Sequence, residues 1–234
     1  MATQYTGLTT ADRRSHDVST KRRLVLLAVP STDPLTQYIS SLLKQLPDIG
    51  APTMFCNIES SITYDKLLYQ NSIDPLDTEI ALIFCGHGER DALLVPSANG
   101  DASDGPRAAT VFFDQSHIAL GPEFLLAFCS RAAAELGKSY EEVTTNRTFI
   151  GFEHKIGLLL AEGIYAQWWT RIIHGMVLAM LTEEDSDKLA KSIFDLYRDA
   201  LKFFSSGEGH RHKWSLMMRA YLRSQMEALR IIRT

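Results

Sequence analysis

Paired cysteines are missing from this sequence of 234 residues. Its three cysteines, Cys56, Cys85 and Cys129, form no Cys-x-x-Cys pair. An odd number of widely spaced cysteines favours reduced thiols in a compartment such as the cytoplasm over a disulfide framework. The short Cys85-x-His87 motif does not make a zinc site, because structural zinc takes four ligands in recognisable pairs. We therefore expect no metal.

Long hydrophobic runs and a strong excess of charge are also lacking. No apolar stretch approaches the ~20 residues that a membrane-spanning helix needs, and residues 1–23 are polar, without the apolar core of a secretory signal. The net charge is −4, which does not suggest nucleic acid as a partner. We therefore expect a cytoplasmic globular protein that binds neither membranes nor nucleic acid.

What the sequence does contain is a series of short apolar runs separated by helical patterns. The runs cover residues 23–29, 80–84 and 124–128, and residues 53–57 and 148–152 are two further short strands. Continuous apolar runs of this length are typical of strands that are buried on both faces of a parallel sheet. Apolar residues from Leu35 to Leu46 repeat at helical spacing after Pro34. This alternation predicts an α/β fold with a doubly wound, mostly parallel sheet flanked by helices.

Shorter segments complete this prediction. Residues 60–71 resemble a weaker helix, and residues 91–96 form a short strand onto which residues 111–113 pair back. Between them, residues 97–107 are rich in Gly, Asp and Ser, which is typical of an exposed, mobile loop. The alanine-rich residues 130–136, followed by Gly137, predict a helix directly after Cys129.

The sequence divides into three parts. We predict a flexible leader over residues 1–21, because they are polar and have no hydrophobic period. The α/β domain is predicted to cover residues 22–182, and residues 183–234 form a helical extension packed on it. Within the second half of the chain, three helical patterns cover residues 156–181, 184–206 and 211–232.

Two of the apolar runs end close to a reactive side chain. His87 follows the run at 80–84, and Cys129 follows the run at 124–128. The carboxyl ends of neighbouring parallel strands meet at one sheet edge, where α/β proteins bind ligands. Taken singly, His87 is an ordinary turn residue and Cys129 an ordinary core thiol. Together they favour a cysteine enzyme with a nucleophile and a proton shuttle.

The residues next to this pair predict further chemistry. A helix that begins at Ser130 would place Cys129 at its N-terminus, where the helix dipole and Arg131 favour the thiolate. We therefore expect Cys129 to have a lowered pKa and to react with iodoacetamide faster than Cys56 and Cys85. The backbone N–H of Gly88 is a candidate oxyanion donor.

An apolar strand followed by His-Gly, and a later one followed by Ala127-Phe128-Cys129, resemble the motifs of the caspase-like (clan CD) cysteine peptidases. Over about residues 22–155 the chain is most similar to the bacterial CHAT-domain branch. The resemblance implies a His87–Cys129 dyad and an oxyanion hole formed by the N–H groups of Gly88 and Cys129. It also implies a protein substrate, no cofactor, and a role in bacterial stress or phage defence. Ala127 and Phe128 differ from better-known members, so the substrate preference is not carried over.

Two other functions stay open. The first is a catalytically inactive form of the same fold, which acts as a regulatory binding or scaffold module. Its C-terminal helices and leader would then contact a regulatory protein partner. The second is an α/β hydrolase of another kind, which the absence of a G-x-S-x-G nucleophile elbow from the sequence disfavours.

Overall fold

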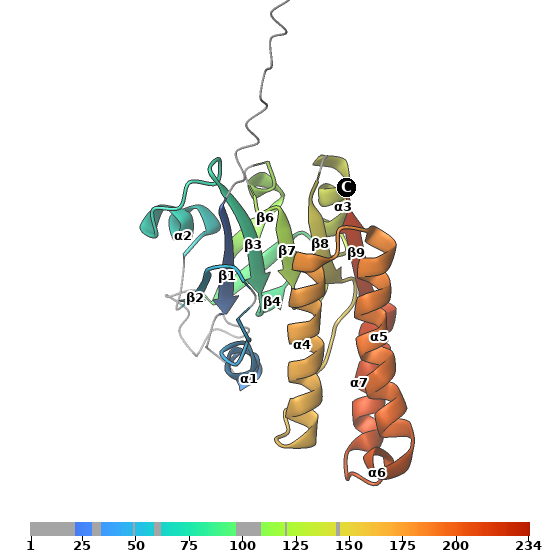
Figure 1. Cartoon of the computed structure of the whole chain (residues 1–234). Helices are drawn as coiled ribbons and strands as arrows, with labels where there is room; N and C mark the ends of the chain where they lie inside the picture. Colours follow the sequence, from blue (N-terminus) through green and yellow to red (C-terminus); the bar gives the residue numbers. More distant parts are fainter. Residues whose placement is uncertain are drawn as a thin grey trace, which may run out of the picture.

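Strands and helices alternate along the first two thirds of the chain, and helices dominate the last third (Figure 1). The computed structural model describes residues 22–29, 34–48, 50–58, 62–96, 109–119, 121–143 and 146–234. Within these residues the order is β1 (Arg22–Val29), α1 (Pro34–Leu43), β2 (Thr53–Asn57), α2 (Tyr64–Gln70), β3 (Thr78–Phe84), β4 (His87–Gly88), β5 (Ala92–Pro96), β6 (Ala109–Asp114), the 3-10 helix η1 (Gln115–His117), β7 (Phe124–Ala127), α3 (Leu136–Val143), β8 (Thr148–Phe152), α4 (Ile164–Thr182), α5 (Ser186–Ser205), α6 (Gly207–His210), α7 (Ser215–Ala228) and β9 (Leu229–Arg233).

The central sheet has the strand order β2-β1-β3-β7-β8-β9. The first five strands are parallel, and β9 pairs antiparallel with β8 at one edge. The residues of β7 and β8 are buried throughout, because side chains on both faces of the sheet are covered. The predicted α/β fold with a mostly parallel sheet is confirmed.

Helices cover both faces of this sheet (Figure 1). On one face, α1, α4, α5 and α7 pack around a core that includes Ile39, Trp169 and Tyr197. On the other face, α2, α3 and the small antiparallel sheet β4-β5-β6 pack around a second core that includes Tyr64 and Phe112. Among the described residues, no helix combines the length and the apolar composition that a membrane crossing requires.

The short segments agree in part with the prediction. β2 and β8 have the predicted bounds, and β6 pairs back onto β5 as expected. The predicted helix at 60–71 is confirmed in its central part, as α2. The predicted leader at 1–21 and the predicted loop at 97–107 lie outside the described residues.

The helix predicted directly after Cys129 is wrong. Residues 130–135 form bends and turns, and α3 begins only at Leu136. Arg131 has a φ of +67°, which a right-handed helix does not accommodate. The N–H groups of Arg131 and Ala133 donate to the carbonyl oxygens of His154 (3.2 Å) and Phe152 (3.1 Å). The backbone is thus bonded to the end of β8 instead of to a helical turn.

The C-terminal prediction is corrected at two places. Residues 156–163 are not helical, and α4 begins at Ile164 after Gly163, whose φ is +66°. The predicted helix at 211–232 ends at Ala228, because Leu229–Arg233 pairs with the open edge of β8 as β9. Side chains of α5 and α7 share a core with the sheet. The domain boundary between residues 182 and 183 remains a prediction.

Candidate active site

The predicted nucleophile and base follow two strands that end at the same edge of the sheet. β3 and β7 are parallel neighbours in which Phe84 pairs with Ala127, and the N–H of Phe128 donates to the carbonyl of Phe84 (2.8 Å). Cys129 comes two residues after β7, and His87 comes three residues after β3. The structure therefore brings both residues to the carboxyl edge of the sheet, as the sequence predicts.

A pocket of about 270 Å³ opens at this edge. Its polar part is formed by His87, Gly88, Cys129 and Ser130, together with the charged residues Glu89, Arg131 and Lys155. Its apolar wall is formed by Leu35, Ile39, Phe128, Ile156 and Leu158. His87 is exposed, whereas only 2% of the Cys129 surface is accessible. Cys129 is thus the buried member and His87 the exposed member of the pair that lines this pocket.

Gly88 lies directly against the thiol. A Cβ atom at this position would be 2.7 Å from Cys129 Sγ and 2.6 Å from the carbonyl oxygen of Ser130. The N–H of Glu89 donates to the carbonyl oxygen of Ala92 (2.9 Å), so these two residues form a hydrogen-bonded pair. Hydrogen-bonded and non-hydrogen-bonded pairs alternate along an antiparallel ladder, so the next pair, Gly88 and Leu93, is a non-hydrogen-bonded one. The Gly88 N–H therefore points away from β5, as a donor to a bound oxyanion must.

If Cys129 is the nucleophile of a peptidase, as proposed below, replacing Gly88 by alanine is expected to lower kcat/KM for a cleaved peptide about 10²-fold, because the thiol or its loop must move by a sizeable fraction of an ångström. The free energy of unfolding should fall by about 1–3 kcal/mol, the usual cost of overpacking. The measurements are steady-state kinetics and thermal unfolding. Gly50→Ala is the control, since a Cβ atom added to this glycine would meet no atom within 4 Å, although its φ is +71°. Equal activity losses in the two variants would contradict the proposed contact.

The loop that carries Cys129 is fixed by the segment that follows β8. Ser130 Oγ accepts a hydrogen bond from the N–H of Ile156 (3.1 Å), and the N–H of Arg131 donates to His154 (3.2 Å). The φ of +67° at Arg131 is unfavourable for a residue with a Cβ atom, and such strain persists only where neighbouring contacts hold it. The thiol and the pocket wall at Ile156 therefore belong to one bonded unit.

The predicted lowering of the thiol pKa is wrong. Cys129 does not stand at a helix N-terminus, since α3 begins seven residues later. Burial raises the pKa of the Cys129 thiol far above its ordinary range, and burial also raises the pKa of Cys56 and Cys85. The Arg131 guanidinium does not offset this effect, because it is half exposed and lies 3.7 Å from Glu89. Burial therefore favours the protonated form of the Cys129 thiol.

This direction predicts a specific pH dependence of alkylation. Iodoacetamide reacts with the thiolate, and an ordinary cysteine with a pKa of about 8.5 reaches its maximum rate soon above that pH. Because the pKa of Cys129 is raised, its modification rate should be slow at pH 7 and should still increase above pH 9. Mass spectrometry of the alkylated peptide measures this rate, with free cysteine in parallel. A rate that is fast at pH 7 and constant above pH 8 would contradict the raised pKa.

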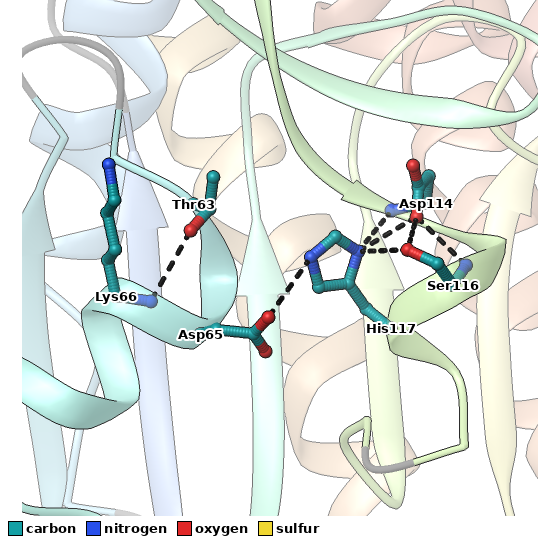
Figure 2. A network of polar contacts seen from close by, with 6 residues as sticks. All are labelled: Thr63, Asp65, Lys66, Asp114, Ser116 and His117. Carbon is teal, nitrogen blue, oxygen red and sulfur yellow. Dashed lines mark hydrogen bonds and ion pairs between the residues drawn. The ribbon is translucent and has the colours of Figure 1, made fainter.

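A second polar network, which the sequence did not reveal, surrounds His117 (Figure 2). His117 Nδ1 lies 2.9 Å from Asp114 Oδ1, and Nε2 lies 3.7 Å from Asp65 of α2. Burial raises the pKa of the Asp114 carboxyl, but hydrogen bonds from Ser116 and His117 outweigh burial, so the pKa is lowered. His117 precedes β7, whereas Cys129 follows it, so this network caps the end of β6 away from the pocket.

No protein-family model matches this chain, and no curated protein sequence is significantly similar to it. Among the described residues, no three His, Cys, Asp or Glu side chains gather in a way that would hold a metal ion. Function must therefore be inferred from the residues of the pocket at the sheet edge.

Proposed function

We propose that this protein is a cysteine endopeptidase of the caspase-like type, similar to CHAT-domain proteins, that cleaves a protein substrate in the cytoplasm. One observation carries the proposal: His87, Gly88 and Cys129 line the same pocket at the carboxyl edge of a parallel sheet. Its volume of about 270 Å³ is near the lower end of ligand pockets, which is enough for one side chain of a peptide. A bacterial stress or phage-defence pathway is the setting that the family resemblance implies.

The reaction starts with attack of Cys129 Sγ on the carbonyl carbon of the cleaved peptide bond. His87 accepts the thiol proton, and the N–H groups of Gly88 and Cys129 bind the oxyanion of the tetrahedral intermediate. Collapse of this intermediate breaks the C–N bond, and His87 donates its proton to the leaving amine. Water, activated by His87, then hydrolyses the thioester and restores the thiol, so that one peptide bond and one water give an acid and an amine.

The raised pKa of Cys129 defines the role of His87 in the proposed reaction. Because burial raises the pKa of the Cys129 thiol, the proposed attack needs a base that takes the thiol proton. Such a site reacts slowly with small alkylating reagents but reacts once a bound peptide presents its carbonyl. Substrate binding and nucleophile activation are therefore coupled.

A peptidyl acyloxymethyl ketone pool with a fluorescent tag tests this function. It should label the wild-type protein at Cys129, and labelling should be lost in Cys129→Ala and strongly reduced in His87→Ala. In parallel, a digest of unrelated proteins is incubated with the enzyme, and new peptide termini are identified by mass spectrometry. Labelling and cleavage that are independent of Cys129 would overturn the proposal.

A second function is favoured by the burial of the thiol. Only 2% of the Cys129 surface is accessible, and its pKa is raised, both of which suit an inactive caspase-like fold that acts as a regulatory binding or scaffold module. This alternative predicts no labelling of Cys129 by any peptidyl probe. It also predicts that the Cys129→Ala protein supports the cellular function as well as the wild type does.

A further inference from the structure

We propose that a basic groove beside the Cys129 pocket selects substrates that carry an acidic residue within a few positions of the cleaved bond. This inference rests on the proposed function and adds a substrate class to it. The groove has a volume of about 610 Å³. Its charged lining residues are Arg90, Arg131, Lys138, Lys155 and Glu153, and His154 also lines it.

The groove adjoins the pocket that holds the thiol. Arg131 and Lys155 line both hollows, and Arg131 is only two residues from Cys129. An extended peptide advances about 3.3–3.6 Å per residue, so a substrate whose carbonyl lies at Cys129 places a neighbouring side chain over the groove after one to three residues. The groove therefore has the position of a specificity subsite.

The charges around the groove favour a carboxylate. Its one lining carboxylate, Glu153, is already paired with Arg230, which lies outside the groove (2.6 Å). Arg90 is paired with Glu135 (2.9 Å), and Arg131 lies 3.7 Å from Glu89. These pairs are exposed and therefore weak.

The ammonium groups of Lys138 and Lys155 have no ion-pair partner among the residues that the structure describes. The lining residues thus carry a positive net charge in a chain whose net charge is −4. An acidic side chain that enters the groove can pair with the ammonium groups of Lys138 and Lys155. It also competes with the exposed carboxylates of Glu135 and Glu89 for Arg90 and Arg131.

An acidic peptide fits these observations better than a nucleic acid does. Proteins that bind nucleic acid neutralise many phosphates along an extended basic surface. Here the cations gather in one groove next to a candidate nucleophile, and the negative net charge of the chain repels a long polyanion. A single carboxylate of a peptide needs only the local positive charge.

Binding is tested apart from cleavage with the full-length Cys129→Ala protein. The immobilised protein is incubated with a pool of synthetic dodecapeptides with randomised positions, and the retained peptides are sequenced. Asp and Glu should be enriched over Asn and Gln by about fivefold, the upper range for one exposed ion pair. Lys138→Glu should remove the enrichment, Lys138→Arg should retain it, and Lys191→Glu on the exposed surface of α5 should leave it unchanged.

Cleavage is measured with the wild-type enzyme and one retained peptide, made with Glu and with Gln at the enriched position. The Glu form should have a higher kcat/KM by a similar factor, and this difference should disappear in Lys138→Glu. Equal retention of acidic and amide peptides overturns the groove proposal, whether or not the enzyme cleaves. A 20-nucleotide single-stranded RNA that binds more tightly than any pool peptide also overturns it. Acidic enrichment without Cys129-dependent cleavage supports the groove and overturns the peptidase function.

Discussion

Replacement of Cys129 by alanine is expected to abolish peptide cleavage and to leave the fold intact. Removing the nucleophile of a hydrolase lowers kcat by about 10⁴–10⁶-fold, because the remaining groups have no bond to form with the carbonyl carbon. Within the part of the chain that the structure describes, the loop is fixed through Ser130 and Arg131 and not through a hydrogen bond of the thiol. The variant should therefore lose only about 1 kcal/mol of stability. Peptide turnover and thermal unfolding measure the two effects.

Cys85→Ala provides the matched control for this experiment. Cys85 is also fully buried and follows β3 directly, but it lies in the core on the opposite face of the sheet and does not line the pocket. Its replacement should cost similar stability and retain turnover. His87→Ala should lose activity to nearly the same extent as Cys129→Ala, because the two residues act as one unit. Wild-type cleavage by Cys129→Ala would show that the nucleophile has been wrongly assigned.

The strands could be predicted because burial on both faces leaves a direct mark on the sequence. The run at 148–152 corresponds to β8 without a shift, and all five of its residues are buried. The shared edge of His87 and Cys129 follows from runs of this kind, since parallel neighbours end on one side of a sheet. In these strands the burial that the tertiary structure imposes requires the same apolar residues that mark the strand in the sequence.

The remaining features depend on contacts between distant segments. The alanines after Cys129 favour a helix by intrinsic propensity, but Arg131 and Ala133 are bonded to the end of β8 instead. β9 continues the sequence of α7 without a break and becomes a strand because β8 offers an unpaired edge. Propensity is a weak signal wherever such tertiary partners exist.

The sequence predicted that His87 and Cys129 lie at one sheet edge, but it predicted neither the raised pKa of Cys129 nor the basic groove. The raised pKa of Cys129 arises from burial, which the sequence did not show. The basic groove combines Arg90 from the β4–β5 turn, Lys138 from α3 and Lys155 from the segment after β8. These residues are dispersed along the chain, so no charge cluster in the sequence marks the groove.

Truncation after Lys155 is expected to destroy the cooperative fold. The deletion removes α4, α5, α7 and β9, so that α1 alone remains of the helices described above on this face of the sheet (Figure 1). It exposes the face that carries Phe128 and Phe152, and it opens the edge of β8. Loss of Trp169 alone, which is fully buried, should cost about 3–5 kcal/mol, a large part of the 5–15 kcal/mol that stabilises a typical domain.

The truncated chain should therefore be insoluble or should unfold without a sharp transition, as measured by circular dichroism during heating. Since a truncated chain can fail for trivial reasons, two single substitutions in the full-length chain accompany it. Trp169→Ala should lower the unfolding temperature strongly. The adjacent Trp168→Ala should lower it less, because Trp168 is only partly buried and stacks against Phe203 and Arg171 at the surface. A soluble, cooperatively unfolding fragment of residues 22–155 with full peptidase activity would refute the dependence of the sheet on these helices.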